Sequence, residues 1–276
     1  MIVSFDSAEK YLAATADMLE QREVENNLIL GICNHLKDKN IQSDQFVFIN
    51  SVTDGAIRAT SIKTAGNAII SIPSPDISGL KELPDYYHHQ NIRLEGVFGE
   101  HPPATAFATY YSRDYFNKIS MIVHRLSDVI EIPEVSGSLK AAGYEDLELV
   151  LEWTGQFRKE TESGNHSNPA EDLAMIKTRI ADGTLYLWMD HEKAVSMAAM
   201  NRKTRHVGVI GYVYTPKGFR GKGYATTLVK TLSKKLLQSG FEYCSLFTDR
   251  ANPTSNHIYR TIGYEPITEF STIIFT

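Results

Sequence analysis

The stretch GFRGKGYATTLVKTLSKKLL, residues 218 to 237, decides the fold of the C-terminal half. Its second part has apolar residues at helical spacing, which predicts a helix that begins near Tyr224. Glycines at positions 218, 221 and 223 stand just before that helix. Backbone N–H groups of such a loop are uncovered at the positive end of the helix dipole. The stretch therefore predicts a phosphate-binding loop, to which Arg220 and Lys222 add positive charge.

Two other phosphate-binding loops fit this stretch poorly. A P-loop requires a glycine where this chain has Pro216, and a serine or threonine where it has Gly223. A dinucleotide-binding fingerprint begins directly after its strand and has a third glycine where this chain has Thr226. Asp249, at the end of the next predicted strand, keeps the dinucleotide interpretation open.

The run HVGVIGYVYT, residues 206 to 215, predicts the strand that leads into the loop. Strict alternation would put Val207, Val209 and Val213 on one face. The other face would then carry Ile210, Tyr212 and Tyr214. Both faces are apolar, so we expect a strand in the middle of a sheet.

A polar stripe lies downstream of the loop, in NPTSNHIYRTIGY, residues 252 to 264. Asn252, Asn256 and Tyr259 are spaced i, i+4 and i+7, so they share one face of a predicted short helix. This face could contact a ligand. Alternatively, the asparagines only cap a surface helix and Tyr259 packs in a core.

The loop resembles a motif of the GNAT superfamily of acyl-CoA N-acyltransferases. Residues 220 to 225, RGKGYA, match its R/Q-x-x-G-x-G/A signature. The resemblance implies that the pyrophosphate of acetyl-CoA is held by Arg220, Gly221, Lys222, Gly223, Tyr224, Ala225 and Thr226. It also implies that the backbone of the preceding strand holds the pantetheine arm and polarises the thioester carbonyl, at Val213, Tyr214 and Thr215.

The downstream stripe is similar to the second CoA motif of the same family. The resemblance implies that Asn252 and Asn256 contact the cofactor and that Tyr259 protonates the departing thiolate. The chemistry suits this role, because a thiol has a pKa of about 8.5 and a phenol, with a pKa of about 10, still carries its proton at neutral pH. No general base is identified. His206 has a suitable pKa, but a lone histidine is more often structural.

The resemblance implies an α+β fold, with a mixed, mostly antiparallel twisted sheet flanked by helices. We place a domain boundary in IPEVSGS, residues 132 to 138, which gives an N-terminal α+β domain over 1–135 and a GNAT domain over 136–276. The N-terminal order of helices, an antiparallel meander, then a strand, a helix over residues 104–116 and a strand echoes the C-terminal half and suggests a degenerate GNAT-like copy. The stretch expected to be equivalent to the glycine loop, LEGVFGEHPPATAF at residues 94 to 107, lacks the phosphate signature. This half would then wall the substrate cleft or mediate a homodimer.

Composition narrows the function classes further. Hydrophobic residues make up 42% of the chain and charged residues 22%, which is typical of a soluble globular protein. A net charge of -5 argues against a nucleic-acid binder, and no apolar run is long enough to span a membrane. Two distant cysteines and scattered histidines predict no metal site and favour a reducing cytoplasmic setting.

The combined prediction is an N-acetyltransferase in which a primary amine attacks acetyl-CoA directly in a ternary complex. A non-catalytic CoA-binding sensor and, less well supported, a dinucleotide-dependent oxidoreductase are the alternatives. The acceptor is not readable from the sequence. Its pocket is expected from residues 144 to 182 together with the N-terminal half, and antibiotics, polyamines, amino acids and protein amines all remain open.

Overall fold

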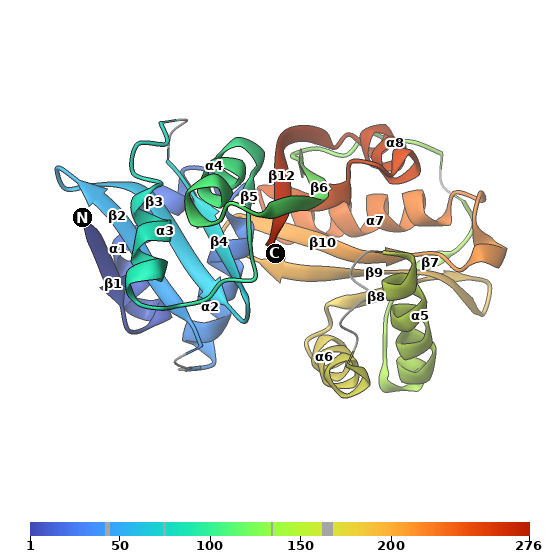
Figure 1. Cartoon of the computed structure of the whole chain (residues 1–276). Helices are drawn as coiled ribbons and strands as arrows, with labels where there is room; N and C mark the ends of the chain where they lie inside the picture. The colour runs from blue at the N-terminus through green and yellow to red at the C-terminus, as the bar shows by residue number, and fades with distance from the viewer. Residues whose placement is uncertain (42–44, 74–75, 134, 162–167) are drawn as a thin grey trace. The chain divides into compact units, whose positions relative to one another are not determined.

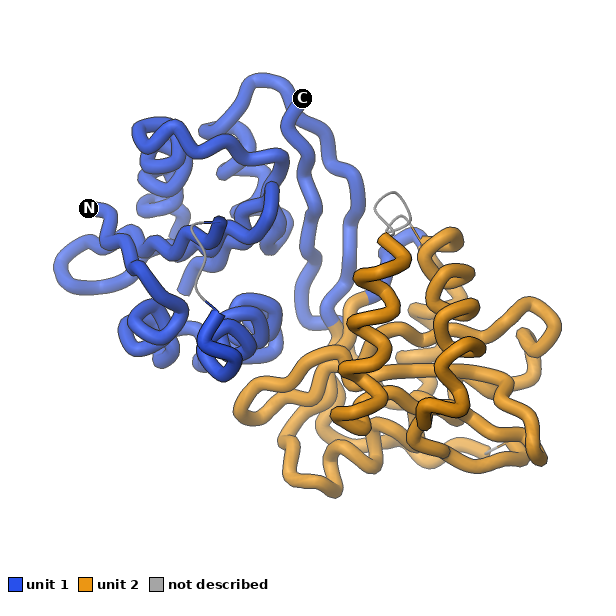
Figure 2. Tube along the Cα trace, turned by 90° about the horizontal axis from the view of Figure 1, so that it is seen from below, with its two compact units in different colours: residues 1–123, 248–251, 266–276 blue, residues 124–247, 252–265 orange. Residues whose placement is uncertain are grey.

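The structure is a computed structural model that describes residues 1–41, 45–73, 76–133, 135–161 and 168–276. It divides the chain into two compact units, coloured in Figure 2. Unit 1 contains residues 1–123, 248–251 and 266–276, and unit 2 contains residues 124–247 and 252–265. The boundary expected between residues 135 and 136 stays a prediction. The expected connection includes Glu134, which lies outside the described residues.

The same order of elements occurs twice along the chain. The first repeat consists of β1 (Ile2–Phe5), α1 (Ala8–Glu20), α2 (Asn27–Asp38), β2 (Val47–Thr53), β3 (Ala56–Thr64), β4 (Asn67–Ser71), α3 (Glu82–His89), β5 (Gly96–Glu100), α4 (His101–Tyr111) and β6 (Tyr115–Leu126). The second consists of β7 (Ser138–Ala141), α5 (Leu147–Glu160), α6 (Pro169–Ala181), β8 (Leu185–Asp190), β9 (Lys193–Lys203), β10 (Val207–Tyr214), α7 (Tyr224–Gln238), β11 (Tyr243–Asp249), α8 (Pro253–Ile262) and β12 (Glu265–Phe275). The expected echo between the two halves is confirmed.

Strand pairing repeats as well. Antiparallel pairing links β1, β2, β3 and β4 in turn, and β4 then pairs with β5 in parallel. In unit 2, antiparallel pairing links β7, β8, β9 and β10, and β10 pairs with β11 in parallel. The predicted mixed, mostly antiparallel sheet is confirmed, as is the central position of β10.

The last strand of the second repeat is built into unit 1. β12 pairs antiparallel with β5, with Phe270 opposite Glu100 and Ile274 opposite Gly96. In the same unit the backbone N–H of Arg250 donates to the carbonyl of Ser120 at 2.9 Å, which joins the end of β11 to β6. Within unit 1, the parallel pair of β4 and β5 is therefore extended by the final strand of the second repeat.

Helices cover both faces of the sheet in each unit (Figure 1). In unit 2, α5 and α6 pack on one face around Trp153, Ile176 and Leu187, and α7 and α8 pack on the other around Leu228, Leu232 and Ile262. In unit 1, α1 and α2 cover one face, and α3 and α4 cover the other.

Side-chain caps fix the starts of two helices. Ser7 accepts a hydrogen bond from the backbone N–H of Lys10 at the start of α1, and Asn168 accepts one from Ala170 at the start of α6. One predicted boundary is wrong. The helix expected over residues 104–116 ends at Tyr111, and Phe116 already belongs to β6.

The expected alternation of side chains along β10 is also wrong at its C-terminal end. Tyr212 has a left-handed φ of 53°, and the register with β9 shifts between Gly211 and Tyr214. This bulge puts Val213 on the α7 face together with Ile210, whereas Tyr212 and Tyr214 pack on the α5 face.

Candidate active site

The predicted phosphate loop connects β10 to α7. After β10 ends at Tyr214, the chain makes a 3₁₀ turn over Lys217–Phe219, and Gly223 forms the N-cap of α7. Gly221 and Gly223 have φ values of +76° and +83°, the left-handed region that favours glycine. A Cβ atom built on Gly221 would have no neighbour within 4 Å. The space over this helix N-terminus is therefore open to an anion.

Arg220 connects the loop to the end of β10 and to α5 at the protein surface. Its Nε donates to the carbonyl oxygen of Thr215 at 2.8 Å, and its terminal nitrogen pairs with the Glu160 carboxylate on α5 at 2.6 Å. The guanidinium also lies over the ring of Tyr214, 5.6 Å from its centroid. Glu160 was not a sequence candidate, because the contact spans 60 residues and leaves no local pattern.

The remaining loop residues differ in which of their groups could contact an anion. Tyr224 is buried, and its hydroxyl donates to Asp190 at the end of β8 at 2.5 Å. Tyr224 would therefore contribute to anion binding through its backbone N–H group. Lys222 is exposed with its ammonium near the Phe219 ring, whereas Ala225 and Thr226 are half-buried in the first turn of α7.

The parallel strands β10 and β11 separate next to this loop. Their paired register runs from Val207 opposite Tyr243 to Val209 opposite Ser245, although β10 continues to Tyr214 and β11 to Asp249. The bulge at Tyr212 lies in the unpaired part. The carbonyl of Tyr214 accepts a hydrogen bond from Ser196 at 3.0 Å, which fixes the strand end from the β9 side.

The three residues of the polar stripe all lie on α8 or at its cap, as expected. The side chain of Asn252 accepts a hydrogen bond from the backbone N–H of Ser255 at 3.1 Å, so this asparagine caps the helix. Asn256 is half-buried and hydrogen-bonds His124. Tyr259 is buried, and loss of hydration raises the pKa of its phenol well above the ordinary range. A phenol with a raised pKa keeps its proton at neutral pH.

His124 is the buried polar neighbour of this stripe that sequence reasoning missed. Its ring lies 6.4 Å from that of Tyr259 and is fully buried. Burial, followed by the nearby charge of Arg260, lowers the pKa of His124 to about 4, against the opposing hydrogen bond with Asn256. The imidazole is therefore neutral near pH 7. His206, the histidine considered from the sequence, pairs with Glu242 at 3.7 Å.

The counterpart of the glycine loop in unit 1 is not the stretch expected from the sequence. The repeated element order makes residues 72–81, between β4 and α3, equivalent to the loop between β10 and α7. A Cβ on Gly79 would lie 2.3 Å from Cβ of Arg58, so that glycine is packed against a side chain. The first turn of α3 carries Glu82 and Asp85. These acids would repel a phosphate, which supports a degenerate copy.

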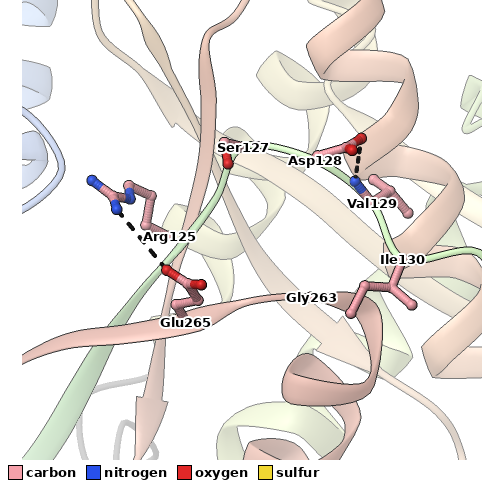
Figure 3. A pocket seen from close by; sticks show the side chains of 7 residues that line it. All are labelled: Arg125, Ser127, Asp128, Val129, Ile130, Gly263 and Glu265. Carbon is pink, nitrogen blue, oxygen red and sulfur yellow. Dashed lines mark hydrogen bonds and ion pairs between the residues drawn. The ribbon is translucent and has the colours of Figure 1, made fainter.

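A surface pocket of about 350 Å³ lies elsewhere in unit 2 (Figure 3). It is lined by the loop after β6, by Gly263 at the end of α8 and by the Arg125–Glu265 ion pair, whose atoms are 4.0 Å apart. None of the predicted site residues lines it. Among the described residues, no group of three or more His, Cys, Asp and Glu side chains could hold a metal, and no helix there is long and apolar enough to cross a membrane.

Comparison with known proteins gives the following matches. The sequence model of the acetyltransferase (GNAT) family matches residues 148–264. No curated protein sequence matches the chain. Among solved structures, a GNAT-family acetyltransferase from Colwellia psychrerythraea is 11% identical, with 100% of both chains covered and a TM-score of 0.62. A GCN5-related N-acetyltransferase from Sphaerobacter thermophilus is 14% identical, covering 99% of this chain and 94% of that one, with a TM-score of 0.63.

A tandem GNAT protein from the clavulanic acid biosynthesis pathway also covers nearly the whole chain. It is 9% identical, with 99% of this chain and 97% of that chain covered and a TM-score of 0.59. At this identity the likeness concerns the fold, and it agrees with the repeated element order. Residues 148–264 thus match the acetyltransferase (GNAT) family, within a chain whose fold is similar to that of tandem GNAT proteins.

Proposed function

We propose that the protein is an N-acetyltransferase that moves an acetyl group from acetyl-CoA to a primary amine by direct attack in a ternary complex. The observation that carries the proposal is the open glycine loop at the start of α7, next to the separated ends of β10 and β11. The loop N–H groups from Arg220 to Thr226 would hold the pyrophosphate. The gap between the strands would admit the pantetheine arm.

The backbone around the bulge would orient the thioester. The carbonyls of Tyr214 and Thr215 already accept hydrogen bonds from Ser196 and Arg220. We therefore assign polarisation of the thioester carbonyl to backbone N–H groups over residues 213–215. A donor aimed at the oxygen where negative charge develops stabilises the transition state more than the ground state.

Tyr259 is the proposed general acid. The acceptor nitrogen bonds to the acetyl carbon, the carbon–sulfur bond breaks, and the sulfur takes the phenolic proton. The amine must lose one proton before attack and another as the amide forms, and no side chain is assigned to that task. A phenol holds its proton at neutral pH, so Tyr259 could donate it to the sulfur as negative charge develops there.

The two cysteines take no part in this chemistry. Cys33 and Cys244 are buried free thiols, and burial raises the pKa of each to about 12. Neither would be a competent nucleophile at neutral pH. Their retention as thiols fits the reducing cytoplasmic setting that we propose.

Calorimetry tests the proposal with acetyl-CoA and NAD as separate titrants. We expect acetyl-CoA to bind with one molecule per chain, because unit 1 has acids where its phosphate loop would be, and we expect no heat with NAD. No binding of acetyl-CoA at any accessible concentration would refute the proposal. Release of free thiol with an amine panel then separates catalysis from sensing, since a sensor would bind acetyl-CoA and turn over none of the amines.

A further inference from the structure

Two arginines of unit 2 lie together without a carboxylate partner. Arg179 on α6 and Arg202 on β9 form no ion pair with any residue that the structure describes. Arg158, on the same side of the sheet, shows the usual arrangement, with Asp172 at 2.5 Å. Burying a guanidinium without a counter-ion is costly, so two neighbouring arginines without a carboxylate partner need an explanation.

The guanidinium of Arg179 is held in place by its neighbours. It lies over the ring of Tyr212, 4.8 Å from the centroid. Its terminal nitrogens donate to the carbonyl of Met200 at 3.4 Å and to the side-chain oxygen of Asn201. Its Nε is sealed from solvent without an acceptor. Arg179 is thus a fixed cation whose Nε donor is unused.

The side chain of Arg202 makes no hydrogen bond to the described residues. Its guanidinium lies over the ring of Phe247 at 5.8 Å, and its Nε is sealed from solvent. Burial, and next the charge of Arg179, lower the pKa of Arg202 to about 10, which still leaves it charged at neutral pH. The residue as a whole is half-buried, and its guanidinium offers a planar fork of donors.

This pair lies beside the proposed acyl-transfer position. Tyr212, which packs under Arg179, is the bulged residue directly before Val213, where the pantetheine arm is expected. Phe157 packs against the same tyrosine, with ring centroids 5.5 Å apart. The acetyl group would therefore be presented next to an aromatic surface that carries two positive charges.

We propose that Arg202, supported by Arg179, binds a carboxylate of the acceptor, so that the substrate class is amino acids or similar amines with a carboxylate. This inference rests on the proposed acetyltransferase function and specifies its acceptor. A carboxylate takes two parallel hydrogen bonds from a guanidinium fork, and its charge offsets the repulsion between the two arginines.

The test compares each amino acid with the amine that lacks its carboxylate, for example L-lysine with cadaverine and L-ornithine with putrescine. Thiol release at saturating acetyl-CoA gives kcat/KM for each member of a panel of amino acids. We expect at least one amino acid to exceed its decarboxylated amine by tenfold or more. Arg202→Gln should remove most of this preference, and Arg202→Lys should not restore it, because lysine has the charge without the fork.

The exposed neighbour Lys203 provides the control, since Lys203→Gln removes a positive charge from the same strand and should leave the preference intact. A second measurement guards against misfolding. Arg202→Gln should keep or raise the Tm of the ligand-free protein, because it removes a buried charge without a partner, whereas a structural arginine would lower it.

Several results would overturn the inference. These are equal kcat/KM within every pair, no turnover of any amino acid, or a preference that persists in Arg202→Gln. The proposed acetyltransferase function is refuted by different results, namely no binding of acetyl-CoA or no turnover of any amine in the panel.

Discussion

Arg220 and Glu160 form an ion pair at 2.6 Å that ties the glycine loop to α5, and the same guanidinium donates to the carbonyl of Thr215. The arginine therefore positions the loop in addition to bringing charge near a phosphate. Both side chains are partly exposed, so we expect the pair to matter little for overall stability.

The first prediction separates the role of Arg220 in positioning the loop from the effect of its positive charge. Arg220→Lys keeps the charge but loses the donor fork, and we expect it to weaken acetyl-CoA binding by roughly fivefold, nearly as much as Arg220→Ala, since one hydrogen bond contributes about 1 kcal/mol. Calorimetry measures both. A lysine variant with wild-type affinity would show that only the charge matters.

The second prediction concerns proton donation by Tyr259. Tyr259→Phe should lower kcat by roughly a hundredfold or more and leave acetyl-CoA affinity nearly unchanged, because general acids typically contribute factors of this size. Tyr264→Phe is a matched control. Its ring lies 5.9 Å from that of Tyr259, and its buried hydroxyl hydrogen-bonds Ser233 at 2.8 Å. The control should lose stability and keep kcat. An unchanged rate in Tyr259→Phe would remove this residue from its role.

The third prediction concerns the open space at the loop. Gly221→Val puts a branched side chain where the phosphate is expected, and we expect acetyl-CoA binding to be lost. Gly183 has a comparable φ of +63° and also has no neighbour within 4 Å of a built Cβ. Each of the two substitutions puts a side chain at a left-handed φ and should lower the free energy of unfolding by ~1–2 kcal/mol. Gly183→Val should nevertheless leave acetyl-CoA binding intact. Equal binding losses in the two variants would point to general destabilisation instead.

The same reasoning applies to Gly223, where crowding adds to the effect. A Cβ there would lie 3.0 Å from a methyl carbon of Val135. Gly223→Val should therefore lose both acetyl-CoA affinity and more stability than Gly221→Val. Urea unfolding of the two variants in the absence of ligand measures the difference.

The fourth prediction follows from the neutral buried His124. The unfolded chain takes up this proton below its ordinary pKa of 6.5, whereas the folded protein takes it up only near pH 4. The free energy of unfolding should therefore fall as pH falls between these values, by about 3 kcal/mol in total. Urea unfolding of His124→Gln should lack this part of the slope. His257 is exposed, so the control variant His257→Gln should keep the pH dependence of the wild type. If His124→Gln also keeps it, His124 is not the group responsible.

The sequence predicts the second repeat well because its signals are local. Glycines at a helix start, the Asn168 cap and the spacing on α8 each depend on a few neighbouring residues. The start of α7 at Tyr224 and the central position of β10 are confirmed. The roles of the predicted cofactor and catalytic residues remain predictions.

The errors arise where long-range packing decides the local structure. Helix α3 is short and has Pro84 in its first turn, so the sequence does not predict it, and the equivalent loop is expected at residues 94–107 instead of between β4 and α3. The bulge at Tyr212 depends on pairing with β9, and the partners of Arg220 and Asn256 come from α5 and β6. No spacing within the predicted motifs contains this information.

The pairing of β12 with β5 has a consequence for biosynthesis. A ribosome releases the chain from its beginning, so the strand partner of residues 96–100 becomes available only after residues 266–276 have emerged. Until then β5 has one unpaired edge, which can attract other nascent chains. A fragment of residues 1–135 would carry that edge permanently, and cutting the gene at this point should give an aggregating product, whereas adding residues 266–276 as a separate peptide should restore solubility.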